Sequence, residues 1–97
     1  MSTAYRFSES VTKESFLKVL KEINVEEHVC DGTNENQFCI SDGKNFMWCY
    51  CGTDSKINDF CRYGVNYSAE HFLEYAASEL KVYLLSEHDD NFFENKD

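Results

Sequence analysis

Carboxylates are the side chains of this sequence whose number and spacing could do chemistry. No Lys or Arg lies between Lys21 and Lys44, while the same stretch holds a run of acidic residues. Further along the chain, Glu70 and Glu74 are four residues apart, which would place them on one face of a helix, about 5–6 Å from each other. A surface of this kind repels nucleic acid and attracts basic proteins, because its charge has the sign of a phosphate backbone.

Seven of the acidic residues are therefore predicted to contact a partner. They are Glu26, Glu27, Asp31, Glu35, Asp42, Glu70 and Glu74. Carboxylates held several ångströms apart on a rigid scaffold resemble the phosphates along a nucleic-acid strand, and such a surface can fill the basic channel of a nucleic-acid-binding protein. The alternative is that the acidity serves solubility alone, with Lys81 and solvent relieving the repulsion between Glu70 and Glu74.

Cysteine and histidine are the other residues that could support a site. The cysteines are Cys30, Cys39, Cys49, Cys51 and Cys61, an odd number that favours reduced thiols over a disulfide framework. A zinc site needs four ligands, and the close pairs here are His28 with Cys30 and Cys49 with Cys51. A redox or zinc-binding regulator using Cys30, Cys39, Cys49 and Cys51 stays an alternative. The spacing favours buried apolar thiols, with no metal and no cofactor.

Catalytic motifs do not occur in the sequence. His28 and His71, together with the cysteines, would permit thiol chemistry. However, the chain contains no nucleophile motif, no phosphate-binding glycine loop and no helix with two metal-binding histidines. We therefore expect a binding protein rather than an enzyme.

The composition predicts one folded domain over residues 1–97, with an acidic tail at about 87–97 that can fray. The chain has 97 residues, of which 42% are hydrophobic and 15% aromatic, enough apolar surface for one core. Its formal net charge of −9 argues against direct binding of nucleic acid. No apolar run approaches the roughly 20 residues that span a bilayer, and no signal-peptide core follows the first six residues. We expect a soluble, cytoplasmic monomer that binds no membrane.

A helical pattern follows the first ten residues. Thr12 can cap the free amides of a first turn, and Val11 before the cap can pack against Phe16 as a hydrophobic staple. Apolar residues then recur at three- and four-residue spacing. We predict a helix over residues 13–23 that stops at Asn24.

A second helix and several short strands complete the predicted fold. Ser68 can cap a helix that runs to about Ser86, with Tyr67 as its staple residue. Between the two helices, four glycines lie nine to twelve residues apart, and strands are predicted around 27–30 and 59–63. We predict an α+β fold in which a three- to four-stranded antiparallel sheet is flanked by an N-terminal and a C-terminal α-helix.

The hairpin around Asp42-Gly43 depends on the length of its loop. A two-residue Asp42-Gly43 loop pairs Ile40 with Asn45 and divides the aromatic residues between two faces. A three-residue Ser41-Asp42-Gly43 loop, with a left-handed glycine, gathers on one face Phe38, Ile40, Phe46, Trp48 and Tyr50. We predict the three-residue loop, and with it Trp48 and Tyr50 in the core, while a position at an interface stays the alternative. The half-polar opposite face then carries Gln37, Cys39, Asn45, Met47, Cys49 and Cys51.

The whole chain resembles a family in its architecture. Small size, strong acidity, helix-sheet-helix order, absence of proline and segments such as Glu26-Glu27-His28-Val29-Cys30-Asp31 are similar to those of the small anti-CRISPR proteins of phages and prophages, particularly those that block the type I-F surveillance complex. The resemblance implies a non-enzymatic inhibitor in the cytoplasm of a bacterial host cell. Its partner would be a guide-RNA-loaded ribonucleoprotein, whose lysines and arginines normally hold target DNA.

The alternative function is that of an immunity protein that neutralises a nuclease toxin. Charge complementarity with a basic active site gives fast capture of such a toxin, so the same acidic surface would serve. The two functions differ in the size of the partner and in whether guide RNA accompanies it.

Overall fold

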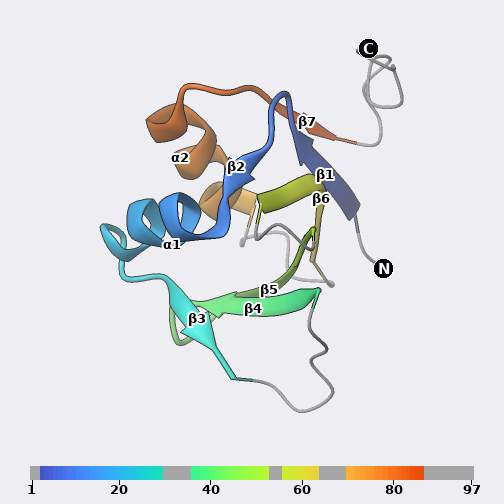
Figure 1. Cartoon of the computed structure of the whole chain (residues 1–97). Helices are drawn as coiled ribbons and strands as arrows, with labels where there is room; N and C mark the ends of the chain where they lie inside the picture. Colours follow the sequence, from blue (N-terminus) through green and yellow to red (C-terminus); the bar gives the residue numbers. More distant parts are fainter. Residues whose placement is uncertain (1–2, 30–35, 53–55, 64–69, 87–97) are drawn as a thin grey trace.

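One antiparallel sheet and two helices make up the part of the chain that the computed structural model describes, residues 3–29, 36–52, 56–63 and 70–86 (Figure 1). In chain order, the elements are β1 Thr3–Phe7, β2 Val11–Thr12, α1 Lys13–Lys21, β3 Glu26–His28, β4 Gln37–Ser41, β5 Phe46–Cys51, β6 Lys56–Tyr63, α2 Glu70–Leu80 and β7 Leu84–Ser86. The fold is α+β, as the sequence predicts, with α1 before the central strands and α2 after them.

The sheet has more strands than the three or four predicted. Its order among the described residues is β3-β4-β5-β6-β1-β7, and β2 pairs with the start of β6. The strands predicted around 27–30 and 59–63 correspond to β3 and β6, and the predicted hairpin corresponds to β4 and β5. The additional strands come from the two ends of the described chain. Strand β1 lies between β6 and β7, so neighbouring strands at this end of the sheet are far apart in the sequence.

Helix α1 begins where the sequence predicts. The Thr12 hydroxyl accepts a hydrogen bond from the Ser15 N–H at 3.1 Å, which satisfies one of the free amides of the first turn. Val11 is partly buried and packs against the core that contains Phe16. The last helical residue is Lys21, slightly before the predicted end of the helix.

The end of α1 is a Schellman motif. Asn24 takes a left-handed backbone with φ 61°, as suits its role as a stop signal. The Val25 N–H donates to the Leu20 carbonyl at 3.0 Å, and the Asn24 N–H donates to the Lys21 carbonyl at 3.1 Å. Val25 and Leu20 are both fully buried, so the motif also anchors the turn to the core. This turn delivers the chain into β3.

Helix α2 is shorter than predicted, because it ends at Leu80 rather than near Ser86. Lys81 takes φ 59°, and the Val82 N–H donates to the Ala77 carbonyl at 3.0 Å, which closes the helix with the same motif. The residues that follow leave the helix and form β7, paired with β1.

The helices are joined by a hydrogen bond between their exposed faces. The Tyr75 hydroxyl of α2 donates to Glu22 Oε1, just after α1, at 2.9 Å. This hydrogen bond, with a smaller effect of burial and of the charges of Glu22 and Glu79, raises the pKa of Tyr75. The predicted α2 cap at Ser68, its staple residue Tyr67 and the acidic tail 87–97 lie outside the described residues.

The β4–β5 hairpin has a register different from the predicted one. Ile40 lies opposite Met47 and Phe38 lies opposite Cys49, so the residues between the strands are the four of the Asp42–Asn45 turn. Gly43 is left-handed, with φ 94°, as predicted. The change of loop length reverses the faces of β5, because side chains alternate along a strand. Residues Met47, Cys49 and Cys51 are buried, and the residues on the other face are Phe46, Trp48 and Tyr50.

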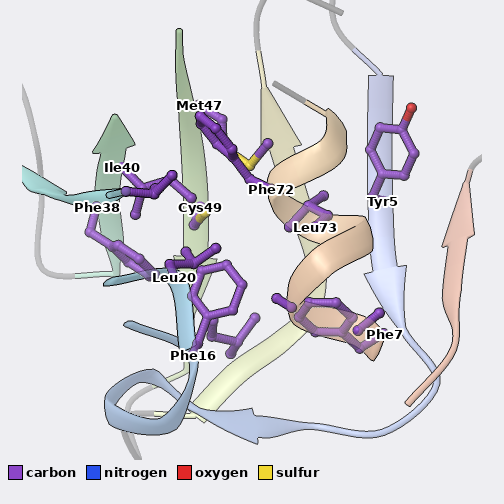
Figure 2. Packing of buried hydrophobic residues seen from close by; sticks show 14 of the residues in the cluster. Tyr5, Phe7, Phe16, Leu20, Phe38, Ile40, Met47, Cys49, Phe72 and Leu73 are labelled. Atoms are coloured by element: carbon purple, nitrogen blue, oxygen red, sulfur yellow. The ribbon is translucent and has the colours of Figure 1, made fainter. Parts of the chain in front are cut away.

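The core fills the space between the helices and one face of the sheet (Figure 2). Helix α1 contributes Phe16 and Leu20, α2 contributes Phe72 and Leu73, and the labelled residues of the strands are Tyr5, Phe7, Phe38, Ile40, Met47 and Cys49. Phe16 packs edge-on against Phe7 and Phe38, with ring centroids 5.9 and 6.3 Å apart. The opposite face of the sheet, here called the outer face, is turned away from the helices.

Candidate partner-binding site

Three of the seven predicted acids line one open groove at the β3 edge of the sheet. Glu26 and Glu27 belong to β3, and Asp42 belongs to the β4–β5 turn. The groove, here called the edge groove, has a volume of about 630 Å³ and is lined by Asn24, Glu26, Glu27, His28, Ser41, Asp42, Gly43, Lys44 and Phe46. Residues distant in the sequence meet there because β3 pairs with β4 just before the turn.

The strand register decides which side chains share a face. Glu26 lies opposite Ser41, and Ser41 lies opposite Phe46, so these three residues form one row across the sheet. Residues directly opposite each other in an antiparallel sheet project from the same face. The row that contains Phe46 belongs to the outer face. Glu26 therefore carries its charge on the same face as an aromatic ring that is 43% exposed.

Glu27 projects from the other face of β3, where α1 supplies a cation. The Lys13 ammonium lies 3.0 Å from Glu27 Oε2. The same ammonium lies 4.5 Å from the centroid of the Phe38 ring, a cation–π contact. The negative charge of the stretch without Lys or Arg is thus partly neutralised by lysines from outside it. Lys13 of α1 binds Glu27, and Lys44 lines the groove. No local sequence pattern pairs Lys13 with Glu27, because the contact depends on how α1 packs beside β3.

The Asp42 carboxylate is held by the turn that it helps to form. Its Oδ1 accepts the Lys44 N–H at 2.9 Å and the Asn45 N–H at 2.7 Å. These backbone hydrogen bonds hold the pKa of Asp42 below its ordinary value of 3.8, and the bond from the Asn45 N–H has the larger effect. Asp42 therefore stays ionised in the groove over a wide pH range, although one of its oxygens already serves the turn.

The other predicted acids do not join the edge groove. Glu74 is exposed and Glu70 half-buried on α2, and Figure 1 shows α2 and β3 apart, with α1 between them. Asp31 and Glu35 lie outside the described residues. The predicted acids of the described residues thus occupy two separate surfaces, one at the β3 edge and one on α2.

Aromatic residues on the outer face are the part of the site that the sequence analysis missed. Trp48 and Tyr50 are half-buried there, although both were predicted in the core. Phe46 and Trp48 pack edge-on, with ring centroids 6.2 Å apart, and Gln37 Nε2 donates to the Tyr50 hydroxyl at 3.2 Å. The length of the β4–β5 loop determines which face of the sheet each β5 side chain occupies, so only the correct loop length would have placed these residues on the outer face.

The described thiols are buried, and two of them belong to the core. Cys39, Cys49 and Cys51 are buried, and Cys49 and Cys51 share the core face of β5. Within the described ranges, no group of three or more His, Cys, Asp or Glu is arranged to hold a metal ion. Cys30, which the zinc alternative also needs, lies outside those ranges.

Comparison with known proteins adds no assignment to this geometry. No protein-family model, curated protein or solved structure matches the chain. Neither of the two helices in the described part of the chain is long and apolar enough to cross a membrane.

Proposed function

We propose that this protein is a non-enzymatic inhibitor that binds the basic nucleic-acid-binding surface of a partner protein through its edge groove. The observation that carries the proposal is the meeting of Glu26, Glu27 and Asp42 around one groove, with the exposed ring of Phe46 at its margin. Cationic side chains that normally hold phosphates would instead meet these carboxylates.

The surroundings of the groove suit a protein partner. Aromatic residues are enriched in protein interfaces, and Phe46 and Trp48 offer aromatic surface on the same face as Glu26. The net charge of −9 favours fast encounter with a basic partner and disfavours nucleic acid. Among basic partners, the resemblance to anti-CRISPR proteins favours a CRISPR surveillance complex in the bacterial cytoplasm.

A DNA-binding competition tests this proposal. Purified type I-F surveillance complex would be mixed with labelled target duplex and increasing amounts of the protein, and bound duplex measured by gel mobility shift. We expect the protein to displace the duplex. The double variant Glu26→Gln/Glu27→Gln should need about tenfold more protein for the same displacement, which corresponds to about 1.4 kcal/mol.

Two further variants control for the loss of charge. Glu9→Gln/Glu14→Gln removes two exposed acids that do not line the edge groove and should change displacement less than twofold. Glu70→Gln/Glu74→Gln tests the α2 surface, and an equal loss there would extend the site to α2. Circular dichroism would verify that each variant is folded. Displacement by Glu26→Gln/Glu27→Gln at the same protein concentrations as wild type would contradict the proposal.

The same protein would be assayed against purified basic nuclease toxins, for which DNA cleavage is the readout. Inhibition of a nuclease without displacement of duplex from the surveillance complex would assign the edge groove to an immunity protein. In that outcome the charge variants should weaken nuclease inhibition in the same order, because both partners present cations to the groove.

A further inference from the structure

Strand β3 is an edge of the sheet. Among the described residues it pairs with β4 alone, and its three residues, Glu26, Glu27 and His28, are all exposed. An edge strand presents backbone N–H and C=O groups that can pair with another chain. The opposite edge, β7, differs because its residues are half-buried and uncharged.

The hydrogen bonds of the hairpin show which backbone groups of β3 point outward. The Asp42 N–H donates to the Asn45 carbonyl at 3.2 Å, and the Cys51 N–H donates to the Asn36 carbonyl at 3.0 Å. Hydrogen-bonded pairs alternate along an antiparallel ladder, so the even-numbered residues of β4 direct their backbone groups toward β5. Ile40 is one of these even-numbered residues.

Glu27 lies opposite Ile40. Because Ile40 bonds toward β5, its pair with Glu27 is not a hydrogen-bonded one, and the Glu27 N–H and C=O point away from β4. The neighbouring residues Glu26 and His28 use their backbone groups to bond β4 instead. The edge therefore offers a donor and an acceptor at Glu27 for an incoming strand.

The side chains around this edge indicate what kind of strand would bind. Glu26 projects from the outer face beside the edge groove, and Glu27 projects from the helix-facing side. Val29, directly after β3, is 93% exposed and offers apolar contact to the same incoming strand. Carboxylates on both faces of the edge complement a strand with cationic side chains on both faces, and one of these side chains would reach the groove between Glu26 and Phe46.

We infer that an extended, arginine- or lysine-rich segment of the partner protein adds to β3 as a further strand, with backbone hydrogen bonds at Glu27 and a cationic side chain in the edge groove. This inference rests on the proposed function, because it names the form in which the basic partner is recognised. Strand addition supplies affinity through main-chain hydrogen bonds and specificity through alternate side chains.

The probe is a seven-residue peptide with arginine at its three central positions and valine elsewhere, so that arginine side chains project from both faces of the added strand. Its binding to the full-length protein would be measured by fluorescence anisotropy, together with hydrogen exchange of the Glu27 amide by NMR. We expect exchange at Glu27 to slow at least tenfold at saturation, while amides of α2 are unaffected. A peptide with glutamate in place of arginine should bind at least tenfold more weakly.

A scan of N-methylated peptides provides the decisive control, since each peptide lacks one backbone donor and keeps its charge. Strand pairing predicts an alternating pattern along the peptide, in which methylation of an amide that faces β3 weakens binding about tenfold and methylation of its neighbours changes it less than twofold. A flat profile, unchanged exchange at Glu27 or no binding of the arginine peptide would overturn strand addition.

The outcomes separate this inference from the proposed function. If Glu26→Gln/Glu27→Gln impairs duplex displacement but the methylation profile is flat, the acidic groove binds its partner without strand addition. If the profile alternates but duplex is never displaced, strand addition stands and the proposed partner is wrong.

Discussion

At the scale of single residues, Asp42 links the charge of the groove to the shape of the hairpin. Its carboxylate accepts the backbone amides of Lys44 and Asn45, while the Gly43 N–H donates to the Ser41 hydroxyl at 2.9 Å. Side chains of Asp and Ser commonly stabilise turns in this way, by accepting amides a few residues on. These contacts stabilise the four-residue turn, and the register of the turn places Phe46 opposite Ser41, in the same row as Glu26.

Replacing Asp42 with alanine should therefore lower the free energy of unfolding at pH 7 by about 1–2 kcal/mol, since two hydrogen bonds to a charged acceptor are lost. The folded-state pKa of Asp42 lies below 3.8, so this stabilisation is present above the unfolded value and is lost as pH falls through the folded value. Urea unfolding of wild type and Asp42→Ala at pH 7, 5 and 3 would measure the difference. This difference should be constant from pH 7 to 5 and narrow towards pH 3, whereas the difference between Asp42→Asn and Asp42→Ala should not change over this range, because neither variant titrates at position 42.

At the scale of elements, local signals predicted where helices begin better than where they end. Thr12 and Asn24 are residue types that favour a helix start and a left-handed stop, so α1 was predictable to within its last turn. The end of α2 carries no such signal, because Lys81 is an unusual residue for a left-handed backbone. Its apolar pattern continues past Leu80, although the chain leaves the helix at Lys81 and pairs with β1 as β7.

Lys81→Gly should accordingly raise the free energy of unfolding by about 0.5–1 kcal/mol, because glycine adopts positive φ without the steric penalty of a side chain. Asn24→Gly is the matched variant at the end of α1, and its gain should be smaller since asparagine already tolerates this backbone. Urea unfolding at pH 7 would measure both. A loss of stability in Lys81→Gly would contradict the steric argument.

The hairpin shows why the site was only partly predictable. Glu26, Glu27 and Asp42 belong to the stretch without Lys or Arg, so they could be named as candidates without the fold, whereas the strand pairing that brings them to one groove could not be predicted. The face on which each aromatic residue of β5 lies depends on the loop length, and an error of one residue in that length moves every β5 side chain to the opposite face. The cation at Glu27 depends on tertiary packing of α1, for which a linear pattern holds no signal.

Two neighbouring residues of β5 test the observed register. Met47 is fully buried and Trp48 half-buried on the outer face. Met47→Ala should lower the free energy of unfolding by about 2–5 kcal/mol, as large-to-small core substitutions do. Trp48→Ala should cost less, because part of its ring is already in solvent. Thermal unfolding by circular dichroism would rank the two, and the opposite ranking would support the predicted three-residue loop instead.

At the scale of the whole molecule, the two ends of the described chain meet in the sheet. Tyr5 of β1 lies opposite Cys61 of β6 on one side and opposite Ser86 of β7 on the other. The pairing of β1 therefore joins segments separated by most of the sequence, whereas the pairings of β3, β4 and β5 are closer in sequence. Long-range pairings of this kind slow folding, because a large loop must close before its contacts form.

Refolding after dilution from urea should be complete in roughly milliseconds to seconds, slower than in small helical bundles. The chain contains no proline, so the tens-of-seconds phase caused by prolyl isomerisation should be absent. Stopped-flow fluorescence of Trp48, the single tryptophan, would record the time course in the presence of a reductant. A phase of tens of seconds that persists at low protein concentration would contradict this expectation.

The position of β1 between β6 and β7 also sets the order of events during synthesis. The first strand leaves the ribosome with neither neighbour available, and its second neighbour is completed only when residue 86 has emerged. We expect the β4–β5 hairpin to form early from its own turn, and β1 to gain its second neighbour only after β7 has emerged from the ribosome. Until β7 has emerged, β1 therefore lacks one of its two neighbours and the sheet stays open on that side.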